Sequence, residues 1–166
     1  MRDVKYDRDA AVSYAHTWAY SRNPRYTDFT NMGGDCTNFV SQCLFAGSGI
    51  MNYTPTFGWY YRNIRDRAPA WTGVHELYSF LISNKGVGPA AVGIDISKIE
   101  PGDIVQLSFD GSLFKHTALV VALTNSPPAP SDVLLAAHDF DCDYRPLDTY
   151  IYERARFLHI THVRKW

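Results

Sequence analysis

The spacing of apolar residues changes once along this chain of 166 residues, and that change constrains the fold more than any other feature. In the first part, apolar residues recur every three or four positions, which predicts three helices, at residues 7–20, 36–47 and 74–82. In the second part, alternating or continuous apolar runs predict four strands, at residues 103–109, 114–123, 133–140 and 156–165. Helices followed by strands are typical of an α+β fold. We therefore expect N-terminal helices packed against one face of a C-terminal antiparallel sheet.

The segment between the second and third helices is rich in aromatic residues and lacks a regular period. We interpret residues 52–71 as a long surface loop with a short helical piece. Its bulky rings would either line a groove for a substrate or fill a layer of the core; they are Trp59, Tyr60, Tyr61 and Trp71.

Composition and charge exclude several classes of protein. With 46% hydrophobic residues the chain can bury a core, so we expect one domain over residues 1–166. A net charge of −1 without a basic stripe does not indicate a nucleic-acid partner, and no apolar run approaches the roughly 18 residues of a membrane span. The first residues lack the apolar core of a secretory signal. A cytoplasmic location is expected unless an upstream segment directs the protein to the cell wall or outside the cell.

The three cysteines do not suit a disulfide framework or a structural metal site. Cys36 and Cys43 lie seven positions apart, which on one helix is about 10.5 Å and too far for a bridge. The chain has no CxxC motif, so we expect neither structural zinc nor another cofactor.

Cys36 is the strongest candidate nucleophile. It opens a predicted helix, whose unpaired N–H groups and partial positive charge favour a thiolate and can hold an oxyanion. Gly33 and Gly34 let backbone and substrate approach closely, whereas the charge of Asp35 opposes thiolate formation unless it is turned away or paired. The alternative is that Cys36 is a small buried apolar residue, an interpretation that suits Cys43 better.

A reactive cysteine needs a base, and His116 at the start of a strand is the candidate. His138, on an otherwise apolar predicted strand, would orient it as a third member. Asp139 and Asp141 are alternative third members. Strand alternation points neighbouring residues to opposite faces, so only one of His138 and Asp139 can serve. The remaining histidines are expected to be structural or exposed: His16, His75, His159 and His162.

Four motifs together resemble one bacterial family, that of the putative amidase domain; they are "YDRDAAVSYAHTWAYSRNPRY", "GGDCTNFVSQCL", "WYY" and "PGDIVQLSF…KHTALVV". The family is similar to the NlpC-like and CHAP cell-wall cysteine peptidases, which are papain-like in arrangement. The resemblance implies that Cys36 is the nucleophile, His116 the base and His138 the third residue, with Asp139 still open. Tyr26 matches the NlpC-like pattern of a tyrosine before the cysteine, and is a candidate oxyanion donor beside the Cys36 backbone.

The function that these residues indicate is hydrolysis of an amide or peptide bond through a thiol. The resemblance suggests bonds of bacterial peptidoglycan as the substrate. Two alternatives stay open: an acyltransferase that uses the same thiolate, and an inactive module that binds the cell wall. The sequence does not indicate an oligomeric state.

Overall fold

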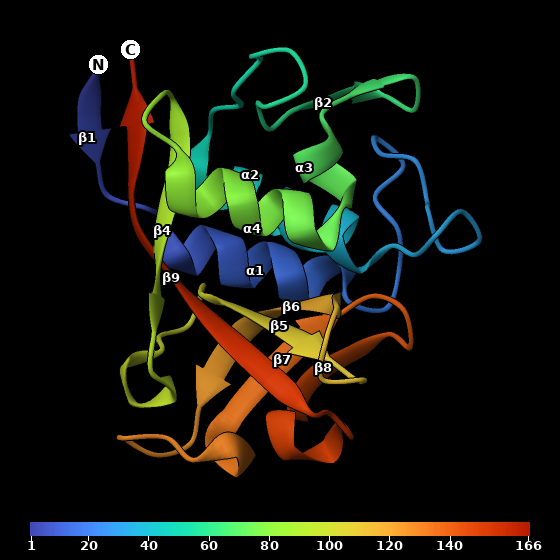
Figure 1. The fold of residues 1–166 in the computed structure, drawn as a ribbon, viewed down its shortest axis with the longest axis vertical. Helices are drawn as coiled ribbons and strands as arrows, with labels where there is room; N and C mark the ends of the chain where they lie inside the picture. Colours follow the sequence, from blue (N-terminus) through green and yellow to red (C-terminus); the bar gives the residue numbers. More distant parts are fainter.

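The computed structural model describes residues 1–166 and contains an antiparallel sheet of seven strands (Figure 1). The strands are β1 (Arg2–Val4), β4 (Gly88–Ile94), β5 (Ile104–Ser108), β6 (Phe114–Leu123), β7 (Val133–Ala137), β8 (Cys142–Pro146) and β9 (Arg154–Lys165). Their order is β1-β9-β5-β6-β7-β8, and β4 also pairs with β9. The last strand in the sequence therefore lies inside the sheet, and the two termini meet where β1 pairs with β9.

Four helices accompany the sheet: α1 (Arg8–Trp18), α2 (Cys36–Ser48), α3 (Pro69–Thr72) and α4 (Val74–Ser83). The side chain of Asp7 caps α1 by accepting a hydrogen bond of 3.0 Å from the Ala10 backbone N–H, as its sequence position indicates. Gly49 ends α2 in the left-handed conformation at φ 69°. Three short 3₁₀ turns complete the elements: η1 (Ile96–Lys98), η2 (Pro130–Asp132) and η3 (Leu147–Thr149). No helix has both the length and the apolar character that crossing a bilayer requires.

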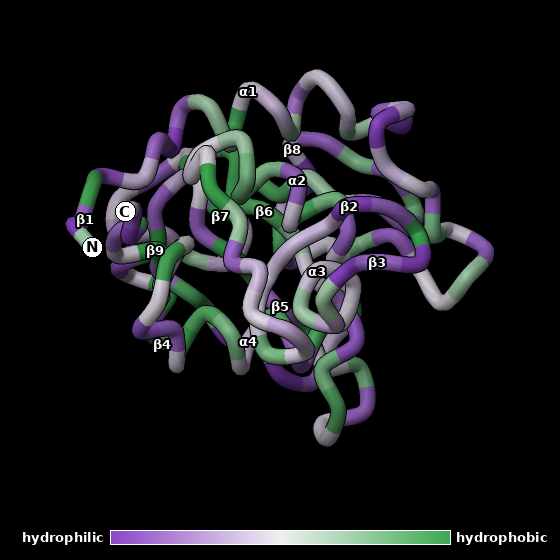
Figure 2. Tube along the Cα trace, turned by 90° about the horizontal axis from the view of Figure 1, so that it is seen from above, coloured by the Kyte–Doolittle hydropathy of each residue, from purple (hydrophilic) through white to green (hydrophobic).

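The sheet separates two apolar clusters. The larger cluster, of 24 buried residues, lies between the helices and one face of the sheet, where Phe39 and Leu44 of α2 meet Leu119 of β6. The smaller one, of nine buried residues, lies on the other face and includes Leu107 of β5 and Leu147 of η3. The trace is apolar along the central strand β6 and mostly polar along the peripheral hairpin of β2 (Tyr61–Asn63) and β3 (Asp66–Arg67) (Figure 2). This arrangement confirms the α+β class.

The N-terminus of α2 packs at the beginning of β6, and this contact positions the candidate site. The hydroxyl groups of Thr37 and Thr117 lie 2.9 Å apart in the interior. The pairing of β6 with β7 reaches only as far as Leu119 and Ala136. The first residues of β6 therefore have an open edge towards β7, beside the first residue of α2.

Two expectations from the sequence need correction. The predicted strand at residues 133–140 stops at Ala137, because Asp139 and Phe140 adopt left-handed backbone angles of φ 61° and 59° that end the extended conformation. The segment at residues 52–71 is not simply a surface loop. It contains the β2–β3 hairpin and α3, and it places Trp59 and Trp71 in the core with no exposed surface.

Candidate active site

Two glycines bring the chain into α2 along a path that only glycine tolerates. Gly33 and Gly34 have φ values of 94° and 109°. A Cβ atom on Gly34 would lie 2.7 Å from Oδ2 of Asp139, closer than real Cβ contacts allow. Gly34 therefore permits the Asp139 carboxylate to approach the backbone immediately before Cys36.

The carboxylate of Asp35, whose effect on Cys36 could not be decided from the sequence, is buried and has hydrogen-bond partners at both oxygens. Its Oδ1 accepts hydrogen bonds from the Phe29 backbone N–H at 2.8 Å and from the Asn38 side chain at 2.9 Å. Its Oδ2 lies 2.5 Å from Nδ1 of His138. The Asp35 side chain thus fixes the loop that precedes α2, and its carboxylate is paired with a histidine.

The Cys36 thiol is nearly enclosed, with 6% of the residue exposed. Its Sγ lies 3.8 Å from the Thr37 hydroxyl, and the Thr117 backbone at the open edge of β6 acts on its pKa. Burial raises the pKa of the Cys36 thiol, the Thr117 backbone opposes this rise, and the Asp139 charge adds to it. The sequence indicated a thiolate favoured by the helix N-terminus. In the structure burial outweighs that effect, so the resting group is a thiol.

His116 precedes Thr117 at the start of β6. Its ring centroid is 5.4 Å from that of Tyr150 and 6.4 Å from that of Phe109. The Nε2 atom is buried and has no hydrogen-bond partner, so no such bond joins it to Cys36. Burial lowers the pKa of His116 to about 4, against the opposing charge of Asp139, and Arg145 lowers it further. The imidazole is therefore neutral at neutral pH and free to accept a proton.

His138 is hydrogen-bonded to residues other than His116. Its Nδ1 is bonded to Asp35, its Nε2 lies 2.8 Å from the Trp18 carbonyl, and its ring stacks on Phe39 with centroids 4.1 Å apart. Only 1% of the residue is exposed. Both ring nitrogens thus have partners other than His116.

The charge of Asp139 acts on both reactive candidates. Both of its carboxylate oxygens accept the Asp35 backbone N–H, at 2.9 and 3.0 Å, and its charge raises the pKa of Cys36 and of His116. Strand alternation does not apply here, since the strand has ended. His138 and Asp139 consequently both reach the N-terminus of α2, one at the Asp35 side chain and one at the Asp35 backbone.

Arg22 is a structural member of the site that the sequence did not single out. Its guanidinium donates to both carboxylate oxygens of Asp141, at 2.9 and 3.0 Å, and lies 3.6 Å from the Asp35 carboxylate. It therefore ties the loop before α2 to the turn after β7. The position of Arg22 in a polar loop carries no signal for this role, which depends on the fold.

Tyr26, the candidate oxyanion donor, packs in the aromatic cluster beside α2. Its ring stacks on Trp71 with centroids 5.9 Å apart and lies 5.1 Å from the Tyr61 ring. Burial raises its pKa, so the hydroxyl remains protonated. No hydrogen bond links it to Cys36, and its part in an oxyanion hole stays a prediction.

One group of side chains outside this region could hold a metal ion: Glu100, Asp103 and His159. Asp103 is fully buried and already bound by the Arg8 guanidinium at 2.8 Å and by His159 Nδ1 at 2.9 Å. The cation in this cluster is therefore the arginine of α1, which joins α1 to β9 through the Ile160 carbonyl at 2.7 Å.

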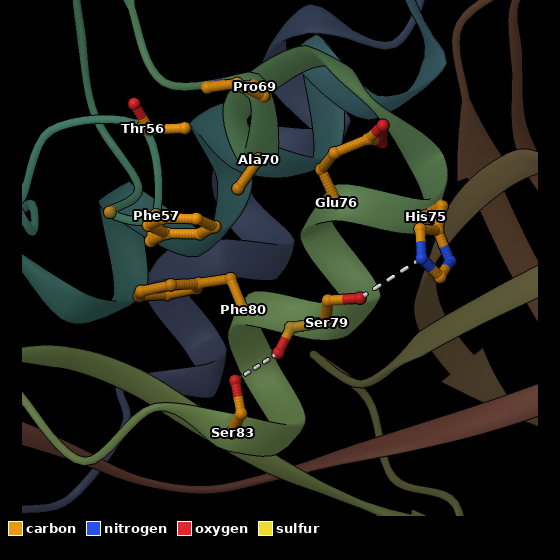
Figure 3. Close-up of a pocket in the computed structure, with 10 residues that line it drawn as sticks. Thr56, Phe57, Pro69, Ala70, His75, Glu76, Ser79, Phe80 and Ser83 are labelled. Atoms are coloured by element: carbon orange, nitrogen blue, oxygen red, sulfur yellow. Dashed lines mark hydrogen bonds between the residues drawn. The ribbon is translucent and has the colours of Figure 1, made fainter.

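A hollow of about 310 Å³ lies elsewhere, against α4 (Figure 3). The Phe57 and Phe80 rings lie on one side of it, and His75 and Glu76 line it from α4. Neither Cys36 nor His116 lines it. The exposed ring at its edge is Phe57, whereas Trp59 and Trp71 of the same segment belong to the core.

Comparison with known proteins identifies one family and two relatives. A family model described as "Putative amidase domain" matches residues 5–161. The chain is 38% identical over 125 residues to the uncharacterized protein YhbB of Bacillus subtilis, and 27% identical over 128 residues to the uncharacterized protein YjcM of the same organism. These matches cover 73% and 72% of the chain but only 39% and 29% of the relatives, so the chain spans less than half their length. No solved structure matches.

Proposed function

The chain belongs to the putative amidase domain family, and we propose that it hydrolyses amide or peptide bonds with Cys36 as the nucleophile. The family description supports amide hydrolysis in general, and the arrangement around α2 supports a thiol mechanism. Cys36 opens the helix, a carboxylate lies beside it, and a neutral imidazole follows on the adjacent strand.

The observation that carries the proposal is the state of His116. Buried nitrogens without a hydrogen-bond partner are uncommon in folded proteins; this chain has three, on His116, Arg156 and His162, and only His116 precedes Thr117, whose hydroxyl contacts Thr37 beside Cys36. A general base explains it, because such a group must keep its lone pair free until the substrate arrives. The low pKa of about 4 keeps the ring unprotonated over the neutral range.

The proposed reaction starts from a neutral thiol and a neutral imidazole. His116 takes the thiol proton as Cys36 attacks the carbonyl carbon of the amide, and the C–N bond breaks after His116 returns the proton to the leaving amine. Water then cleaves the thioester, again with His116 as the base. The backbone N–H of Cys36, in the first turn of α2, is the proposed donor to the oxyanion.

For the third member we propose Asp139, the alternative from the sequence, in place of His138. Its charge favours the protonated form of His116, which is the form that appears during attack. His138 is a positioning residue in this proposal, since its bonds go to Asp35 and Trp18. Asp35 in turn fixes the loop that leads into Cys36.

Bonds of bacterial peptidoglycan are the proposed substrate. The support is the resemblance of the cysteine and histidine motifs to the cell-wall cysteine peptidases. Digestion of purified peptidoglycan and of soluble muropeptides, followed by mass analysis of the products, tests both the bond and the substrate. A new amine and a new carboxylate are expected with the unaltered protein and with Cys142→Ala, and none with Cys36→Ala.

Trapping the intermediate tests the mechanism separately from the substrate. An activated ester of an N-acyl amino acid should acylate one thiol of the folded protein, and peptide mapping should place the acyl group on Cys36. Acylation of Cys142, the more exposed thiol, with Cys36 unmodified would overturn the assignment.

A further inference from the structure

A line of polar side chains, three of them buried and one half-buried, leads from β9 to the Cys36 thiol, through the layer between the sheet and the helices. Its members are Arg156 of β9, Gln106 of β5, Thr117 of β6 and Thr37 of α2. Gln106, Thr117 and Thr37 are at most 1% exposed. None of them has a part in the proposed reaction.

The hydrogen-bond direction is fixed at the Gln106 amide. The Arg156 guanidinium can only donate, and its Nε lies 2.8 Å from Gln106 Oε1. The Gln106 Nε2 group donates to the Val74 carbonyl at 2.9 Å, and a carbonyl can only accept. The arginine identifies the amide oxygen and the Val74 carbonyl identifies the amide nitrogen. The two assignments agree, and they place the NH₂ group next to Thr117.

The remaining bonds take their direction when the thiol ionises. Gln106 Nε2 donates to Thr117 Oγ1 at 3.2 Å, which leaves the Thr117 hydrogen free to point to Thr37 Oγ1, 2.9 Å away. A thiolate can only accept, so the Thr37 hydroxyl then donates to the sulfur and Thr37 Oγ1 accepts from Thr117. Its other partner is Cys36 Sγ at 3.8 Å, which lies within the range of a hydrogen bond to sulfur.

We propose that this line is a directed chain of donors, which begins at the Arg156 guanidinium and stabilises the Cys36 thiolate as it forms. We call it the donor chain; its members are Arg156, Gln106, Thr117 and Thr37. Each bond polarises the next, and the three members nearest the sulfur are buried, so the guanidinium supports the developing negative charge on sulfur without touching it. The proposal rests on Cys36 as the nucleophile, and the four residues are positioning residues.

The donor chain also offsets two effects that make the Cys36 thiol harder to ionise. Burial and the Asp139 charge both oppose ionisation of the Cys36 thiol. Asp35, the other acidic group near this thiol, is paired with His138. The Thr37 hydroxyl and the Thr117 backbone both lower the pKa of this thiol and so oppose these two effects.

The test titrates the Cys36 thiol directly. Protein with ¹³C at Cβ of its three cysteines gives three resonances, which Cys43→Ala and Cys142→Ala assign. Thr37→Val and Thr117→Val should raise the titration midpoint of Cys36 by about one pH unit, because a hydrogen bond to a charged group is lost. Thr37→Ser keeps the hydroxyl and should restore the original midpoint.

Gln106→Glu tests the direction of the chain. A glutamate can accept from Arg156 but has no hydrogen to give Thr117, so Thr117 donates to the glutamate and Thr37 loses the bond that polarises its hydroxyl. The midpoint should rise as in Thr37→Val. Ser41→Ala is the matched control, since Ser41 is a buried hydroxyl on the same helix that bonds Trp59 and Trp71 and not Cys36.

The outcomes separate the alternatives. An unchanged midpoint in Thr37→Val overturns the proposal, even if Gln106→Glu or Thr117→Val does not fold. A shift in Ser41→Ala as large as in Thr37→Val also overturns it, because the effect would then come from packing. The titration does not require turnover. A failed hydrolysis assay with a shifted midpoint therefore counts against the proposed function, and the reverse pattern counts against the donor chain.

Discussion

His116 and His138 come from neighbouring parts of the sheet and are both nearly inaccessible, yet their surroundings are opposite. His138 has partners at both ring nitrogens and stacks on Phe39. His116 has a buried Nε2 without a hydrogen-bond partner, and its ring lies beside those of Phe109 and Tyr150. The first environment fixes a ring in place, whereas the second leaves a nitrogen available for chemistry.

The comparison teaches that burial alone does not distinguish an anchor from a reactive group. A histidine that anchors a loop has its hydrogen bonds satisfied before any ligand arrives. A histidine that moves protons keeps one nitrogen without a hydrogen bond. The stability lost in this way is offset by interactions elsewhere in the fold. Substitution of Cys36, His116, Asp139 and His138 tests whether the two histidines divide the work in this way.

The largest effect is expected from Cys36→Ala. Without the sulfur no thioester forms, so hydrolysis of peptidoglycan fragments should fall to the background rate. Cys142→Ala is the control and should retain the original rate. Turnover by Cys36→Ala well above background would show that hydrolysis takes place at another site, and His116 would then not be its base.

The second largest effect is expected from His116→Gln, which should reduce kcat/KM by about 10²–10⁴-fold. In the unaltered protein the pH profile should have an acidic limb near the pKa of about 4, with the rate falling as pH drops through it. Below that pH the ring is protonated and cannot accept the thiol proton. The limb should vanish in His116→Gln, and a limb that persists there would assign it to a different base.

Asp139→Asn should have a smaller effect on the rate. Asparagine tolerates the left-handed angle of 61° and keeps an oxygen to accept the Asp35 backbone N–H. The charge that supports protonated His116 is lost, so kcat should fall on the order of 10²-fold while the acidic limb moves to lower pH. An unchanged limb and rate would remove Asp139 from the reaction.

Several parts of this molecule could be predicted from the sequence because they depend on local rules. The strand at 114–123, the Asp7 cap and the left-handed Gly49 follow from period, capping chemistry and the tolerance of glycine. Strand β4 was missed, because its residues are mostly small and it pairs with β9, which comes much later in the chain.

The candidate site could be predicted only in part. Cys36 and His116 stand out by their places at a helix start and a strand start. The roles of His138 and Asp139 depend on where β7 ends, which the left-handed residues after His138 decide. Gln106 is a polar residue in an apolar strand and so signals a buried partner, but its partner Arg156 lies 50 positions away.

The smallest effect on the rate is expected from His138→Ala, and it should appear in stability instead. Removing the ring leaves the Asp35 carboxylate buried without its histidine, and loss of one partner of such a pair costs about 3 kcal/mol or more of unfolding free energy. The remaining bonds from Phe29 and Asn38 still hold Asp35, so the folded fraction should retain kcat within about threefold. Urea unfolding measures the first quantity, and initial rates at a temperature where the variant is folded measure the second. The opposite result would be a His138→Ala variant that is as stable as the unaltered protein but hydrolyses the substrate about 10²-fold more slowly. His138 would then be the third member that the sequence first indicated. The contrast between the two histidines would not hold.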